Sequence, residues 1–443
     1  MRVLVYKMSR LLHPKLVTIV LFFSLSAMGD HHELPRISEA PPMKLSDLIS
    51  EAVEKNSDLK ASKSEVERSE AEVGPMGSYE DPMLGFEAMN YPVDSFSQSQ
   101  FGMTGNQISL TQKIPFPGKI SKRRQAARSG SEATKEMAES KRLEIIKQVK
   151  LAYYGLHAEY KKYDSLNEQK KLVNQLVSVT RNKYALSQSS QAEVLNLQVE
   201  EASLIDQLLI VEKQIKAKLG ELNHLMGRAD HSQYLYGRPE EIRKTPFDFK
   251  KYTEKVIAEK ALSKSPMVKG KVAKLQEAES KLSYAKWNYL PDFEFKLAYT
   301  ERKPSPGDSG VDFFSGMIGI TIPLWAGSKQ SEEKRGATAE KIRSEALLDE
   351  ERINLSHMIH VHYAELEESN KRLQLFEGGV LPLVRQAVVS SRSAYLTKKI
   401  DYSTLLNAIN KRFQMELSYA EALSSYESMI AELELLVGGS LGD

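Results

Sequence analysis

Residues 108–124 read ISLTQKIPFPGKISKRR, and residues 318–335 read IGITIPLWAGSKQSEEKR. Both stretches contain alternating apolar and polar residues, a proline close to an aromatic residue, a glycine, and a basic start to a long helical pattern. Alternation with a period of two is typical of a strand, and a period of about 3.6 is typical of a helix. The sequence therefore predicts the same strand-to-helix corner twice.

The two corners belong to a longer internal repeat. Tyr184 begins YALSQSSQAEVLN and Tyr395 begins YLTKKIDYSTLLN, while LMG ends at Gly227 and LVG ends at Gly438. Five such pairs follow in the same order, at offsets of about 208 to 211 residues. Five pairs in the same order at a nearly constant offset indicate a duplicated unit rather than chance similarity.

The repeat divides the chain into six predicted parts. They are a signal peptide (1–29), an extended N-terminal arm (30–44), a first repeat (45–227), a linking equatorial segment (228–251), a second repeat (252–438) and a short tail (439–443).

The signal peptide is predicted from a basic start followed by the short apolar run LVTIVLFFSLSAMG. A buried N-terminal helix is the alternative interpretation. Beyond this run the sequence contains no apolar stretch near the ~20 residues that a membrane helix needs. If the mature chain enters a membrane, we expect it to do so as a closed β-barrel.

Composition excludes several classes of protein. The 443 residues contain no cysteine, so disulfides, thiolate metal sites and thiol catalysis are excluded. Basic and acidic residues nearly balance, at 61 and 59, so no basic field indicates a nucleic-acid partner. The sequence contains no glycine-rich phosphate loop, nucleophile elbow or HExxH motif, so we expect no enzyme and no cofactor.

Each repeat is predicted to contain two strands of about eight to ten residues. In the first repeat these are MLGFEAMNY from Met83 and ISLTQKI from Ile108; in the second they are FEFKLAYT from Phe293 and MIGITI from Met317. Each has one apolar and one polar face. A loop reading ERKPSPGDSGVDFF is expected between the second pair. Four strands are too few to close a barrel, so other chains are required.

Helical patterns of unusual length follow each strand pair. The first extends from about Lys119 to Leu186, and the second extends from Ser328 to Thr397. Each returns after a polar break, SQSSQ or KKIDYS, so that each repeat forms a long helical hairpin. The second pattern is interrupted by GGVLP at Gly378 to Pro382, where a kink is expected. The apolar seams of such hairpins must be covered by other helices.

With these features the sequence resembles the outer membrane efflux proteins of the TolC type, over about Leu45 to Gly438. The duplicated unit, the corners IPFPGK and IPLWAGSK and the two hairpin tips carry the resemblance. It implies a mainly α fold in which long antiparallel hairpins form a periplasmic tunnel. It also implies a homotrimer, in which four strands per protomer complete a 12-stranded barrel in the Gram-negative outer membrane.

The corners are where strand changes to helix. The proline ends the strand, the aromatic residue suits a membrane interface, and the glycine frees the turn into the helix. An ordinary strand-to-helix loop is the alternative for either copy alone. The residues concerned are Pro115, Phe116 and Gly118 in the first repeat and Pro323, Trp325 and Gly327 in the second.

The resemblance also implies that the hairpin tips form a periplasmic gate. The residues that fall there are Glu193, Asn196, Lys399, Asp401, Thr404 and Asn407. The family has acidic residues where Thr404 and Asn407 stand, which puts block of the closed tip by divalent cations in doubt. Glu193 and Lys399 are candidates for a latch; the alternative is that both are solvated tip charges.

DPMLGFEAMNYPVDSF followed by QKIPFPGK resembles the heavy-metal branch of the family. The implied function is passive conduction of cations such as copper or silver to the exterior. The partners would be an inner-membrane pump, a periplasmic adaptor and outer-membrane lipid. His357 and His360 lie one helical turn apart and could share a metal ion, but equivalent histidines are missing from the first repeat, so no metal site is expected.

Alternatives remain open for both cargo and class. The same fold could serve drug efflux or type I protein secretion. A periplasmic adaptor or coiled-coil scaffold is the rival from another class. The duplicated strand pairs favour the channel, because an adaptor or scaffold does not need them.

Overall fold

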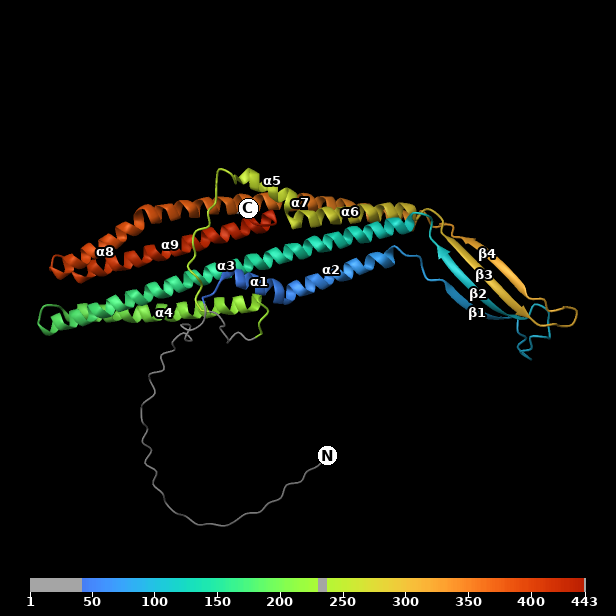
Figure 1. The fold of residues 1–443 in the computed structure, drawn as a ribbon, viewed down its shortest axis with the longest axis horizontal. Coiled ribbons are helices and arrows are strands. Elements are labelled where there is room, and N and C mark those ends of the chain that lie inside the picture. The colour runs from blue at the N-terminus through green and yellow to red at the C-terminus, as the bar shows by residue number, and fades with distance from the viewer. Residues whose placement is uncertain (1–41, 230–236, 442–443) are drawn as a thin grey trace, which may run out of the picture.

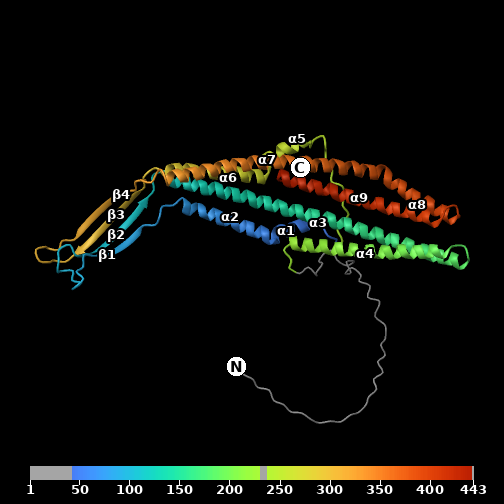
Figure 2. The ribbon, with the colours of Figure 1, turned by 180° about the vertical axis from the view of Figure 1, so that it is seen from behind.

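The computed structural model describes residues 42–229 and 237–441. The predicted signal peptide and most of the predicted arm lie outside these residues. The chain is highly elongated, with a β-sheet at one end, long helices side by side through the middle, and two helical hairpin tips at the other end (Figure 1). The view from behind shows the same arrangement (Figure 2).

Both halves of the chain present the same order of elements. The first half contains α1 (Leu45–Lys55), α2 (Ser57–Met76), β1 (Met83–Met89), β2 (Gly105–Ile114), α3 (Lys119–Ala185) and α4 (Gln191–Leu225). The second contains α5 (Glu254–Lys264), α6 (Pro266–Trp287), β3 (Phe293–Arg302), β4 (Phe313–Ile320), α7 (Gln330–Leu375), the π turn η2 (Phe376–Val380), α8 (Leu381–Leu396) and α9 (Tyr402–Val437).

The four strands form one antiparallel sheet in the order β1-β2-β3-β4. Leu110 pairs with Leu297 and Ile108 pairs with Tyr299, so the register places apolar side chains next to each other on one face. That face is exposed and continuous; its members are Leu84, Phe86, Ile108, Leu110, Phe295, Leu297, Tyr299, Ile318 and Ile320. The opposite face is polar, and the Gln107 amide there donates to Thr300 Oγ1 at 3.1 Å.

All four strands overlap the predicted segments, but β2 begins at Gly105 rather than Ile108, and the β3–β4 connection is shorter than expected. Ser305 and Asp308 exchange backbone hydrogen bonds of 2.9 and 3.0 Å, and this tight turn lets the ladder extend to Arg302 and back from Phe313. β4 therefore begins four residues before the predicted Met317. It ends at Ile320 rather than Ile322.

The helical stretch that begins each repeat is divided. In the first repeat the division falls at Asn56, whose backbone is extended, with ψ 125°. Its side chain accepts from the Leu59 amide at 3.1 Å and donates to the Leu225 carbonyl at 2.8 Å. One residue thus caps α2 and ties it to the end of α4.

The two long helical patterns give different helices. α3 is continuous over 67 residues. The equivalent run of the second repeat is broken by the π turn η2 at the predicted interruption, where Gly378 and Gly379 precede Pro382. Among the described residues, no helix combines the length and the apolar character needed to cross a membrane.

Each repeat has an apolar core of its own. The first core is built from α1, α3 and α4 around residues such as Leu156 and Ile215. The second is built from α5, α7 and α9 around Ile359 and Tyr426. The described part of the linking segment, 237–251, crosses between them (Figure 1).

One buried acid fixes the linking segment to α9. Glu427 accepts from the Thr245 amide at 2.6 Å and from its hydroxyl at 2.8 Å. Burial raises the pKa of the Glu427 carboxyl above its ordinary value. The two hydrogen bonds to Thr245 compensate part of the desolvation of this group.

Candidate functional site: the hairpin interface and its tips

The distal half of the molecule consists of two hairpins, α3/α4 and α8/α9, that lie along each other (Figure 1). A small apolar core joins them near the tips. Tyr395, Leu405 and Phe413 are buried there, and Leu172 and Leu176 of α3 pack against this group. The contact holds the two repeats together at the end farthest from the sheet.

A row of polar contacts continues this interface away from the tips. The Gln169 amide donates to Asn410 Oδ1 at 2.5 Å, and the Asn410 amide donates to Glu200 at 3.4 Å. The Arg412 guanidinium donates to Glu168 at 3.2 Å. These bonds connect α3 and α4 of the first repeat with α9 of the second.

Arg412 lies at the centre of this row. Besides Glu168 it approaches Glu416 to 3.6 Å, and Glu416 accepts a 3.2 Å hydrogen bond from Arg385 of α8. The Arg412 side chain is only 20% exposed, so these charges interact more strongly than a fully solvated pair. The contacts thus form a chain from the first hairpin through α9 to α8.

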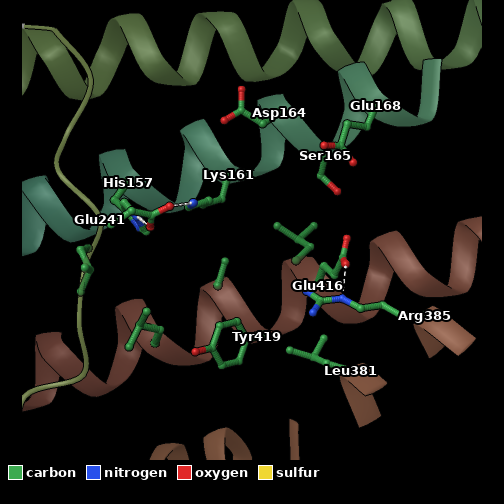
Figure 3. Close-up of a pocket in the computed structure, with 14 residues that line it drawn as sticks. His157, Lys161, Asp164, Ser165, Glu168, Glu241, Leu381, Arg385, Glu416 and Tyr419 are labelled. Atoms are coloured by element: carbon green, nitrogen blue, oxygen red, sulfur yellow. Dashed lines mark hydrogen bonds and ion pairs between the residues drawn. The ribbon is translucent and has the colours of Figure 1, made fainter. Parts of the chain in front are cut away.

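A cavity of about 470 Å³ opens where this chain of charges meets the linking segment (Figure 3). Leu381, Arg385, Glu416 and Tyr419 line one side of it from α8 and α9. The opposite side comes from α3 and from the linking segment: His157, Lys161, Asp164, Ser165, Glu168, Glu241 and Ile242.

A buried histidine stands at one end of the cavity. His157 Nε2 lies 3.4 Å from Glu241, and Lys161 donates to the same carboxylate (Figure 3). Burial lowers the pKa of His157 below its ordinary value, against the opposing effect of Glu241. The hydrogen bond from Lys161 lowers the pKa of the Glu241 carboxyl. The imidazole is therefore neutral at physiological pH.

The predicted gate residues lie at the tips, and several of them form hydrogen bonds within their own helix ends. Glu193 lies in the first turn of α4, and its amide donates to the capping Ser190 hydroxyl at 3.2 Å. Its carboxylate accepts from Ser189. Asp401 caps α9, where it accepts from the Thr404 amide at 2.9 Å.

The latch pair considered above is not formed in the single chain. Among the ion pairs of the described residues, none joins Glu193 to Lys399. The tips are instead connected by Asn196, whose amide donates to the Tyr402 hydroxyl at 3.4 Å. Asn407 is exposed on α9. The gating role of these residues therefore stays a prediction.

The first corner is packed tightly between sheet and helix. Phe116 contacts Trp287 edge to face, with ring centroids 6.1 Å apart, and stacks on Phe293 at 6.3 Å. The buried ammonium of Lys119 donates to Asp292 at 2.8 Å. Gly118 has a φ of 101°, which favours glycine.

The second corner has the same sequence pattern but different surroundings. Trp325 is 72% exposed, and Leu324 beside it is 77% exposed. In the described part of the chain, no neighbouring atom lies within 4 Å of the position that a Cβ on Gly327 would take. Trp325, beyond the Pro323 that follows the strand, is therefore exposed as an interfacial residue would be, whereas Phe116 has become part of a packed corner.

Two histidines of α7 have separate acidic partners, and His357 is exposed. His360 Nδ1 lies 3.0 Å from Glu254, and His362 Nδ1 lies 3.3 Å from Glu365. Within the described residues no group of three or more His, Asp or Glu side chains could hold a metal ion.

The row of contacts centred on Arg412 was missed by sequence reasoning. Arg412, Asn410 and Gln169 stand in ordinary helical patterns, where polar residues are expected to be solvated. The available signal was spacing: Arg412 and Glu416 lie one turn apart on the helix that carries the buried Ile409 and Phe413. The residues near Arg412 in the sequence do not indicate that α3 packs against this part of α9.

Comparison with known proteins agrees with this geometry. The model of the outer membrane efflux protein family matches residues 48–228, nearly the whole first repeat. This match confirms the resemblance to the outer membrane efflux proteins. A search of curated proteins found no match.

Solved structures extend the similarity of fold over both repeats. CusC has a TM-score of 0.75 and 14% identity, with 89% of this chain and 92% of that chain covered. VceC of Vibrio cholerae has a TM-score of 0.75 and 18% identity, with 89% of this chain and 96% of that chain covered. The CmeC outer membrane channel of Campylobacter jejuni has a TM-score of 0.70 and 16% identity, with 89% of this chain and 85% of that chain covered.

The predicted fold class is confirmed by these structures. The predicted location, in the Gram-negative outer membrane with an extension into the periplasm, is that of the family.

Proposed function

We propose that this protein is the outer-membrane channel of a tripartite efflux system and conducts substrate passively from an inner-membrane pump and a periplasmic adaptor. The observation that carries the proposal is one continuous sheet with an exposed apolar face, joined directly to helices that project away from it. Such a face is suited to lipid, and the helices are suited to a tunnel. No catalytic role is proposed.

The unpaired edges of the sheet support assembly into a homotrimer. β1 and β4 are the two edge strands and expose Leu84, Phe86 and Ile318. An exposed apolar edge promotes aggregation unless another strand pairs with it. Because β1 and β4 run in opposite directions, β4 of one copy pairs antiparallel with β1 of the next, and three copies close a barrel of about twelve strands.

The distal helices support the same assembly. Val389 and Leu396 on α8 are 66% and 71% exposed and lie seven residues apart. On α4, Leu195 and Val199 are 52% and 68% exposed. Exposed apolar stripes with this spacing are typical of helices that pack against a further helix. We therefore place α8 of one protomer beside the first hairpin of its neighbour.

For the cargo, we propose heavy-metal cations, on the resemblance of residues 81–96 and 112–119 to the heavy-metal branch. CusC is among the similar structures. Drug efflux and type I secretion are served by the same fold, so a deletion strain complemented with the gene separates them. Restored copper or silver resistance supports the metal cargo, and restored resistance to organic drugs alone contradicts it.

The channel itself is tested by planar-bilayer conductance of the purified mature protein, with its mass measured in parallel by light scattering. We expect a trimer that inserts and gives steady single-channel currents. A monomer that never inserts would contradict the channel and favour an adaptor or scaffold.

A further inference from the structure

The hairpin tips carry a charge pattern that passive conduction alone does not explain. Lys398 and Lys399 lie in the turn between α8 and α9, and both are exposed. Within the described part of the chain, neither ammonium group has a carboxylate partner. Lys398 has a φ of 58°, which is uncommon for a residue with a side chain. The turn thus directs two free cations into solvent.

The acids of the tips are engaged by local hydrogen bonds. Asp401 accepts from the Thr404 hydroxyl at 2.5 Å, from the Thr404 amide at 2.9 Å and from the Ser403 hydroxyl at 3.0 Å. The hydrogen bonds from Thr404 lower the pKa of the Asp401 carboxyl. Glu193 accepts from Ser189 in the first turn of α4. Both acids lie at helix N-termini, whose partial positive charge offsets theirs.

The remaining polar residues of the tips are neutral. Thr404 lies in the first turn of α9, and Asn196 and Asn407 lie in the second turns of α4 and α9. The charged residues of 183–196 and 395–407 are Lys183, Lys398, Lys399, Glu193 and Asp401. These are three cations against two anions, and both anions are bound to their own helix. The end of each protomer is therefore positive.

We propose that the hairpin tips form an anion-preferring mouth, in which Lys398 and Lys399 determine the charge selectivity of the channel. The inference rests on the proposed function, because three protomers bring six of these lysines around one opening. Rings of lysine or arginine select anions in narrow pores, where fixed charges control the local ion concentration.

This mouth has a direct consequence for the cargo. Free metal cations are repelled from it, so they enter only when the pump drives them or when their ligands neutralise them. Anionic or neutral solutes enter without this barrier. Inorganic tripolyphosphate added at the tip side should bind these lysines and block the current.

Reversal potentials in a gradient of KCl across a planar bilayer test the proposal. We expect wild-type channels to prefer Cl⁻ over K⁺, K398Q/K399Q channels to lose most of this preference, and K398E/K399E channels to prefer K⁺. The control is K60E/K63E, which makes the same change of charge at exposed lysines of α2. It should select ions like the wild type.

The possible failures can be told apart. Wild-type channels that prefer K⁺, or K398E/K399E channels that select ions like the wild type, would overturn the selectivity proposal and leave the channel function standing. Protein that forms no pores at all would overturn both. Tripolyphosphate that blocks wild-type and K398Q/K399Q channels equally would also count against the mouth.

Discussion

Single residues control how firmly the two repeats hold each other in the distal half. Arg412 contacts Glu168 of the first hairpin at 3.2 Å and Glu416 of its own helix at 3.6 Å. Glu168 is 65% exposed and can be solvated when the contact breaks, whereas Arg412 is mostly covered. Breaking the pair therefore costs more free energy at the covered Arg412 than at the exposed Glu168.

Replacing Arg412 by alanine should loosen the distal hairpins. We expect a loss of about 1 kcal/mol in the interaction between them, because a half-buried pair contributes more than a solvated one. Single-channel recordings should show a higher open probability. Arg392→Ala, at an exposed position of α8, is the matched control. Equal open probabilities in the two variants would show that Arg412 does not restrain the hairpins.

His157 should make the stability of the protein depend on pH. Burial keeps the pKa of the folded imidazole below the 6.5 of an ordinary histidine. As the pH falls below 6.5, the unfolded chain therefore binds a proton before the folded chain does. The contribution of the neutral His157 to the free energy of unfolding is therefore complete above pH 6.5. It is lost progressively as the pH falls towards the lower pKa of the folded state.

Thermal unfolding followed by circular dichroism, from about pH 7.5 to about pH 5.5, measures this effect. The wild type should lose more stability over the interval than His157→Gln. Since Glu241 and Lys161 remain in both proteins, only the difference between the two curves reports on the imidazole. Parallel curves would contradict the assignment of a neutral buried histidine.

At the scale of elements, the two strand-to-helix corners share one sequence pattern but pack against different neighbours. The first corner is closed by Trp287, Phe293 and the ion pair of Lys119 with Asp292. At the second corner, none of the described residues covers Trp325 in a comparable way. Duplication preserved the turn chemistry, while each copy acquired the neighbours of its own half.

Alanine substitution at the two corner glycines should therefore give unequal results. A Cβ on Gly118 would overlap the Trp287 ring, and a φ of 101° is unfavourable for alanine. We expect Gly118→Ala to cost at least about 1–3 kcal/mol and to reduce the yield of folded trimer. Gly327→Ala meets no atom within 4 Å and should be tolerated. Melting temperature and trimer yield measure both; similar losses would contradict the packing described.

At the scale of the whole molecule, the sheet has one apolar face and one polar face, and the proposed barrel uses them to separate lipid from water. Leu297 lies at the middle of the apolar face, paired with Leu110. Ser315 pairs with Ala298 on the polar face of the same sheet. In the proposed barrel the first face would meet lipid and the second would meet the interior.

A lysine should therefore be costly on one face and acceptable on the other. We expect Leu297→Lys to destabilise the barrel by about 2–4 kcal/mol, since lysine near the bilayer midplane is expensive. Ser315→Lys should assemble like the wild type. The fraction of heat-resistant trimer in outer-membrane extracts measures this. Equal assembly of both variants would overturn the assignment of faces.

The sequence by itself determined what depends on local pattern. Alternation predicted the four strands and their apolar faces, helical periodicity predicted α3 to its last turn, and the GGVLP segment marked the break at the π turn. These features follow from residues within a few positions of one another, whose periodicity selects strand or helix directly. The repeat and its corners were sufficient to indicate the family.

Only the tertiary structure decided what depends on distant neighbours. It paired Gln169 with Asn410 and Glu168 with Arg412 across more than 240 residues, and it buried His157 beside Glu241. It also covered one corner and exposed the other. Hydrogen bonds and burial of this kind depend on which helix packs against which, and such packing is a property of the folded chain that no local period encodes.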